Sequence, residues 1–167
     1  MRILILVYFV AYLASCRGHR NKHIFSSEDE KFFYTDCNGM DYIRFPLLMP
    51  YDVMCINFRG EKNWVTRLNQ GFEFHHTINL IKEISVQNNI IFIHSLSEHQ
   101  IIEGENPKQW FLIIPSKKIE LGFLNEAELK SYVEQYKIIK INWIQAQDLY
   151  NQFKDSECLP WVPGCSE

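Results

Sequence analysis

The sequence predicts an α+β fold, with an antiparallel sheet and C-terminal helices packed on one face of it. Runs rich in β-branched and aromatic residues, which are typical of strands, crowd the first two thirds of the chain. Amphipathic segments with helical spacing come in the last third. Strands and helices that are segregated in this way favour an α+β fold over a doubly wound parallel sheet, in which the two alternate.

The first strand-like region extends from Phe32 to about residue 74. In YIRFPLL (42–48), Pro46 indicates an edge or bulged strand, because proline cannot donate a hydrogen bond to a neighbouring strand. Residues 53–58 and 64–69 are β-rich and flank the turn-like RGEKN. This arrangement predicts a β-hairpin.

The next segments are more apolar. In TINLIKEISV (77–86), isoleucines spaced by three fit a helix, whereas the β-branched content fits a strand, so both remain open. After Asn88-Asn89, IIFIHSL (90–96) is predicted to be a buried strand, and QWFLIIP (109–115) is the strongest strand in the chain.

The C-terminal third carries the helical signals. Asn125 is a good N-cap for a helix over 126–136, with acidic residues in its first turn and an apolar stripe along one side. Residues 138–144 alternate like a strand or an extended link, and 146–153 form a second short amphipathic helix.

The N-terminus has the pattern of a secretory signal. Arg2 supplies a positive charge, Ile3 to Leu13 carry no charge, and the small residues Ala14 and Ser15 follow. Eleven residues at about 1.5 Å each reach only about half of the hydrocarbon core, so a spanning helix is not expected. We expect residues 1–15 to be a cleaved leader, 16–31 a flexible tether and 32–167 a single globular domain.

Leu13-Ala14-Ser15-Cys16 resembles the lipobox of bacterial lipoproteins, a likeness that covers only the first 17 residues or so. It implies that the Cys16 thiol receives a diacylglycerol, that the leader is cut before Cys16, and that the new amine is acylated. Two or more acyl chains anchor a protein stably to a membrane. Arg17 at the second mature position resembles lipoproteins sent to the outer membrane. An ordinary secretory leader and an uncleaved anchor are the alternatives.

Four cysteines remain besides Cys16, and an even number in an exported chain suggests disulfide bonds. Cys158 and Cys165 enclose the proline-stiffened CLPWVPGC and form the favoured pair. A Cys37–Cys55 bridge then follows by elimination. Cys55 lies inside the apolar run VMCINF, so a buried free thiol is its alternative.

Composition excludes one class of partner. Without the leader the chain has about 152 residues and four more acidic than basic ones, with no basic stripe of the kind that binds nucleic acid. The expected partners are a membrane, through the lipid, and another envelope or secreted protein.

Catalytic and metal motifs are weak. There is no GxSxG elbow, and the neighbours His94 and Ser95 point to opposite faces of a strand. The histidines at 75, 76, 94 and 99 match no metal-ligand spacing, and the cysteines do not have zinc spacing. Glu103 and Glu105 fit a solvated loop better than a carboxylate pair. We expect no catalytic residues, no cofactor and no metal.

Tryptophans offer the better candidate contacts, because they bury a large area at low entropic cost. Trp110 in the strongest strand and Trp161 in the cysteine loop are the candidate partner contacts. The alternative for Trp161 is that it folds back as a plug on the core.

These observations favour a membrane-anchored envelope lipoprotein that binds a protein without catalysis, by analogy with periplasmic immunity lipoproteins. A lipid-anchored enzyme acting on cell-wall or glycan substrates and an accessory subunit of an envelope assembly or secretion machine are the alternatives. An enzyme should show a cleft with polar groups and shifted pKa values. A binding module should show an exposed aromatic patch with a polar rim.

Overall fold

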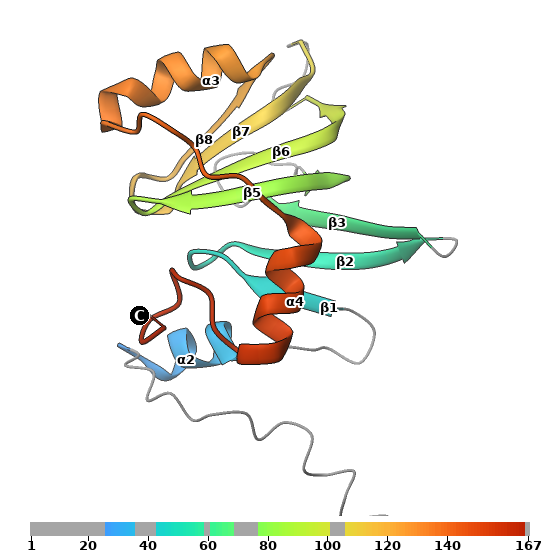
Figure 1. Ribbon diagram of the computed structural model, residues 1–167, viewed down its shortest axis with the longest axis vertical. Helices are drawn as coiled ribbons and strands as arrows, with labels where there is room; N and C mark the ends of the chain where they lie inside the picture. The colour runs from blue at the N-terminus through green and yellow to red at the C-terminus, as the bar shows by residue number, and fades with distance from the viewer. Residues whose placement is uncertain (1–25, 36–42, 59–60, 69–76, 101–105, 166–167) are drawn as a thin grey trace, which may run out of the picture.

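The computed structural model describes residues 26–35, 43–58, 61–68, 77–100 and 106–165. Within these ranges the chain forms two antiparallel sheets and helices, which confirms the α+β class, and a C-terminal helix packs on a sheet (Figure 1). The leader, Cys16 and Cys37 lie outside the described residues, as do His75, His76, Glu103 and Glu105.

The first sheet has four strands in the order β1-β2-β3-β4. They are β1 (Ile43–Pro46), β2 (Asp52–Phe58), β3 (Glu61–Arg67) and β4 (Thr77–Ile78). Pro46 ends an edge strand, as its missing N–H requires. The predicted hairpin is formed by β2 and β3, with Cys55 opposite Trp64. Strand β3 begins three residues earlier than expected.

The second sheet has five strands in the order β8-β7-β6-β5-β9. They are β5 (Ile81–Gln87), β6 (Ile90–His99), β7 (Lys108–Ile114), β8 (Ile119–Phe123) and β9 (Ile144–Gln145). Residues 77–86, left open by the sequence, are therefore strand and not helix. Asn88 and Asn89 both have positive φ, 52° and 59°, which suits a tight hairpin turn.

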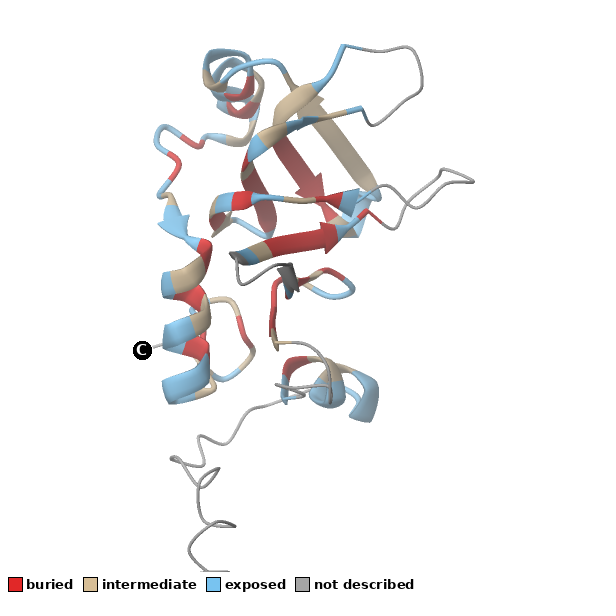
Figure 2. Cartoon of the chain, turned by 90° about the vertical axis from the view of Figure 1, so that its right-hand side faces the viewer, coloured by how far each residue is buried: buried red, intermediate tan, exposed pale blue. Residues whose placement is uncertain are grey.

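Residues 90–93 of β6 and 111–114 of β7 are buried on both faces (Figure 2). One face contributes Ile91, Ile93, Phe111 and Ile113 to a first core, shared with the four-stranded sheet and helix α4 (Ala146–Ser156). The other contributes Phe92 and Leu112, among others, to a second core under helix α3 (Glu126–Val133).

The C-terminal helices are close to their predicted places. Asn125 is the N-cap of α3: its Oδ1 accepts a hydrogen bond from the N–H of Glu128 at 3.0 Å, while Glu128 Oε2 accepts from the N–H of Leu124 at 3.0 Å. A 3₁₀ turn, η3 (Glu134–Tyr136), completes the helical segment, and another, η2 (Pro115–Lys117), links β7 to β8. Leu149 and Phe153 of α4 are buried as expected.

The main correction is at the start of the domain. Residues assigned to the tether and to a strand-like region form helix α2 (Glu28–Thr35). Ser27 caps it, since its Oγ accepts from the N–H of Glu30 at 3.1 Å, and three acidic residues occupy the first turn. Tyr34 is buried and its hydroxyl accepts from the N–H of Met49 at 3.3 Å, which fixes α2 to the domain.

Two further segments differ from expectation. Strand β8 was not expected, because IELGF contains a glycine and a charge and its residues are only half-buried. Residues 138–144 are largely an extended link, and only Ile144 at their end pairs in β9. This link crosses the sheet from α3 to α4 (Figure 1).

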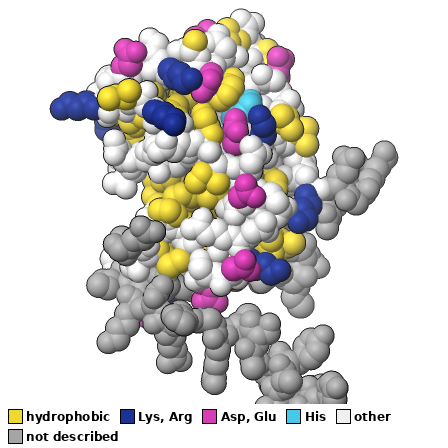
Figure 3. Space-filling model, in the orientation of Figure 1, with side chains coloured by type: hydrophobic (Ala, Val, Ile, Leu, Met, Phe, Trp, Pro, Cys, Tyr) yellow, Lys and Arg dark blue, Asp and Glu magenta, His cyan; other side chains and the backbone are white. Residues whose placement is uncertain are grey.

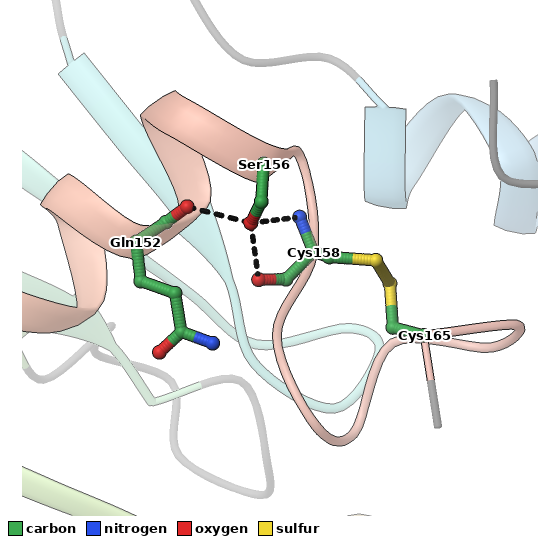
Figure 4. The surroundings of a disulfide bond; sticks show 4 residues. All are labelled: Gln152, Ser156, Cys158 and Cys165. Carbon is green, nitrogen blue, oxygen red and sulfur yellow. Dashed lines mark hydrogen bonds between the residues drawn. A yellow bond between two sulfur atoms is a disulfide. The ribbon is translucent and has the colours of Figure 1, made fainter. Parts of the chain in front are cut away.

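The predicted Cys158–Cys165 disulfide is formed, with Cα atoms 5.5 Å apart (Figure 4). Ser156, at the end of α4, joins the helix to this loop: its hydroxyl donates to the Gln152 carbonyl at 2.7 Å and accepts from the Cys158 N–H at 3.2 Å. Cys55, the expected partner of Cys37, is instead a buried free thiol. Burial raises the pKa of this thiol.

We predict that Cys158→Ser with Cys165→Ser lowers the free energy of unfolding by about 2–3 kcal/mol, the loop-closure value for a short loop. Urea denaturation followed by circular dichroism measures the loss. Wild-type protein under a reductant should lose the same amount, because Cys55 is not cross-linked. An unchanged midpoint in both samples would contradict the prediction.

Candidate functional site: an aromatic cluster and a histidine-lined cavity

His94, Trp110 and Trp143 form an aromatic cluster on the α3 face of the five-stranded sheet. His94 of β6 lies opposite Trp110 of β7 in the strand register, and their rings stack with centroids 3.7 Å apart and 2° between their planes. Trp143, from the link that crosses this face, has its ring 5.4 Å from Trp110 and 6.4 Å from His94. The fold thus brings together side chains from two strands and a distant link.

The carboxylate of Glu83 orients His94. Glu83 Oε1 lies 2.8 Å from His94 Nδ1, and Oε2 accepts from Gln145 Nε2 at 3.2 Å. Glu83 is the register partner of both residues, one on β6 and the other on β9. One carboxylate therefore ties three strands together beneath the cluster.

Trp143 is held in a similar way from the helix above. Its Nε1 donates to Glu126 Oε1 at 3.2 Å, and Lys130 Nζ lies 2.8 Å from the same oxygen. The hydrogen bond from Lys130, with that from Trp143, lowers the pKa of the Glu126 carboxyl. The carboxylate is therefore charged at neutral pH, and the indole orientation is fixed before any ligand arrives.

The cluster is only partly buried. Trp110 and Trp143 are half-buried and pack against the second core, and Leu124, which follows the Trp110 strand partner Phe123, is 44% exposed. Figure 3 shows hydrophobic side chains mixed with lysine or arginine, carboxylate and histidine side chains over this part of the molecule. Partly exposed aromatics with a charged rim are typical of an interaction surface.

Trp161, the other candidate contact, is positioned differently. Its Nε1 donates to the carbonyl of Pro46 at 3.1 Å, and its ring packs against the first core. This is the folded-back arrangement that the sequence left open as the alternative. Trp161 thus holds the disulfide loop against β1, and Trp110 is the better candidate for a contact.

A second polar cluster lies on the opposite face of β6, where Ser95, Ser97 and His99 follow one another at every second residue. His99 Nε2 is 3.1 Å from Ser95 Oγ, 2.8 Å from Ser97 Oγ and 3.2 Å from the Asn79 carbonyl oxygen. From the sequence, a serine–histidine pair was considered only for Ser95 with its neighbour His94, and His99 was not considered. The period-two pattern S-x-S-x-H was the signal that could have identified His99, since it puts all three on one face.

The arrangement does not activate a serine. Ser95 Oγ donates to the Asn79 carbonyl at 2.7 Å, and Ser97 Oγ donates to Asn79 Oδ1 at 2.8 Å, so both hydroxyl protons are committed. The Asn79 carbonyl can only accept, so the contact with His99 Nε2 places the proton on Nε2. A catalytic base would need a lone pair there. In this cluster His99 is therefore a hydrogen-bond donor to its neighbours and does not accept a proton from either serine.

His99 lines a cavity of about 420 Å³ between the two sheets, together with Ile78, Glu98 and Phe111. Burial lowers the pKa of the His99 imidazole, so the ring is neutral at neutral pH. His94 and His99 belong to separate clusters, as their spacing of five implied.

We predict that His99 lowers stability in acid. Its pKa is depressed in the folded state, so the unfolded chain binds the proton more readily, and stability is lost as pH falls below the unfolded value of about 6.5. In His99→Gln, the fall in unfolding free energy between about pH 7.5 and 5.5 should be smaller than in the wild type. Urea titrations at the two pH values test this. Equal falls in both proteins would contradict it.

The described residues contain neither a membrane-spanning helix nor a metal-ligand cluster. No helix among the described residues is long and apolar enough to span a membrane, and in the same ranges no three His, Cys, Asp or Glu side chains gather as metal ligands would. Comparison with protein-family models, curated proteins and solved structures gave no match for this chain.

Proposed function

We propose that this chain is a bacterial envelope lipoprotein, anchored through acylated Cys16, that binds another envelope or secreted protein without catalysis. The observation that carries the proposal is the partly exposed cluster of His94, Trp110 and Trp143, with charged groups at its edge. Aromatic anchors of this kind supply much of the affinity in protein interfaces.

The surface is suited to binding because it is already ordered. Glu83 holds His94 and Glu126 holds Trp143, so little side-chain entropy remains to be lost on association. The exposed Leu124 follows Phe123, the strand partner of Trp110, and extends the apolar area, and Lys130 supplies a charge that selects a partner. A secreted antagonist, as for immunity lipoproteins, is the partner that suits a small acidic domain.

The proposed anchor sets where this surface works. Glu28, the first residue of α2, is twelve positions after Cys16 in the chain. A fully extended chain of that length spans at most about 40 Å. The domain would therefore stay within about one domain diameter of the membrane, and the outer membrane is the location that Arg17 favours.

A lipid-anchored enzyme is the second candidate, favoured by the cavity beside His99. A half-buried histidine with a shifted pKa in a cavity is a feature of active sites. The proton on Nε2 argues against serine chemistry there, because neither Ser95 nor Ser97 has a base to remove its proton. Binding by the aromatic cluster is therefore preferred.

We predict that the protein expressed with its own leader in a bacterium sediments with membranes and carries acyl mass, and that Cys16→Ala does neither. Intact-mass spectrometry and membrane fractionation test this. Wild-type protein that is soluble, cleaved and free of lipid would contradict the lipid anchor while leaving the aromatic cluster open to test.

We predict that Trp110→Ala weakens capture of the partner from envelope extracts by about 10- to 30-fold, the effect expected of an interface anchor. Leu124→Glu, at an exposed rim position, should do the same without disturbing the core. Phe32→Ala is the matched control, since Phe32 is 68% exposed on α2. Equal losses in all three variants, or none in the first two, would contradict a role for the cluster.

A further inference from the structure

The cavity beside His99 carries an inference independent of the aromatic cluster. Leu68 follows β3, Ile78 ends β4, His99 ends β6, and Phe111 lies in β7, so both sheets contribute to its lining. Its volume of about 420 Å³ falls within the range of small-molecule sites. Leu68, Ile78 and Phe111 are buried residues, which give the cavity an apolar wall.

The hydrogen-bond network leaves one ring nitrogen of His99 as an acceptor. His99 commits its Nε2–H to the Asn79 carbonyl and the serine oxygens. The neutral ring then carries its lone pair on Nδ1, and no hydrogen bond joins that atom to any of the described residues. Ser95 and Ser97 have both donated their protons to Asn79, so they cannot act as donors toward the cavity. A ligand that contacts His99 Nδ1 must therefore bring the donor.

The charged groups at the cavity also favour a ligand that donates hydrogen bonds and carries a positive charge. Glu98 lines it and is exposed to solvent, which leaves its carboxylate free to meet a cation. The described lining residues include no lysine or arginine, although Lys108 is the strand partner of His99 outside the lining. Thr77 and Gln100 also line the cavity and can donate hydrogen bonds, but the charged side chain among the described lining residues is the Glu98 carboxylate, which repels an anion and attracts a cation.

We propose that this cavity binds a small primary amine with an apolar body, whose N–H donates to His99 Nδ1 and whose charge is balanced by Glu98. The apolar body lies against Leu68, Ile78 and Phe111. The site goes beyond protein binding by the aromatic cluster, which is on the opposite face of β6, and either can fail without the other.

The test uses three probes with the same phenyl body: 2-phenylethylamine, 2-phenylethanol and 3-phenylpropionate. Each is titrated into ¹⁵N-labelled protein and followed by NMR. We expect the amine to shift the signals of Ile78, Phe111 and the His99 ring nitrogens most, the alcohol to bind more weakly, and the acid not to bind. Long-range imidazole spectra of the free protein should show the proton on Nε2.

Two variants separate the two contacts. His99→Gln should weaken the amine about tenfold, the loss expected for one hydrogen bond at a buried site. Glu98→Gln, at an exposed position where folding is not at risk, should remove the preference for the amine over the alcohol. Ile139→Ala, at a residue that is 98% exposed and remote from the lining, is the control and should bind like the wild type.

Several results would overturn the proposal: a proton on Nδ1, acid binding as tight as amine binding, no shift with the amine, or amine affinity unchanged in both His99→Gln and Glu98→Gln. If His99→Gln fails to fold, the tautomer in the wild type and the Glu98→Gln comparison still decide the question.

Discussion

Burial of β6 and β7 on both faces is the constraint on which the rest of the structure depends. Their residues alternate between the two cores, with Ile91 and Ile93 facing one and Phe92 the other. A strand of this kind cannot shift its register by one residue, because every side chain would change cores. The same alternation sends His94 to one surface and Ser95 to the opposite one. The two candidate sites are therefore back to back, and their relative placement is as rigid as the sheet.

Much of this arrangement could be predicted from the sequence because local chemistry and tertiary structure agree. The β-branched, apolar runs at 90–96 and 109–115 are short enough to be buried strands, and the structure has strands there. Asn125 and Glu128 predict the start of a helix, and the structure has α3 beginning there. Cys158 and Cys165 are close enough in the chain to meet with little entropic cost. Trp110 could be named as a candidate contact because it is a large aromatic side chain in a segment that is clearly a strand.

The rest depends on contacts between segments distant in sequence. Helix α2 is polar and has few core residues, so its anchor, the contact of Tyr34 with the N–H of Met49, is visible only in three dimensions. Strand β8 pairs at an edge where half-burial weakens the alternation of its residues. His99 was missed because it lies beyond the apolar run of β6, in a polar stretch where the pairing with β7 is irregular. Trp143 joins the aromatic cluster through a link that has almost no secondary structure.

The carboxylate of Glu83, which connects β6 to β9, has a consequence for the order of folding. The hairpins β5–β6, β6–β7 and β7–β8 join neighbours in sequence, whereas Gln145 must return to Glu83 across 62 residues. Contacts of such separation form late, since the intervening chain must first be ordered. The meander can therefore assemble early, while Trp143 reaches Trp110 only after β9 has paired. A growing chain would therefore lack the finished aromatic cluster until its last quarter is in place.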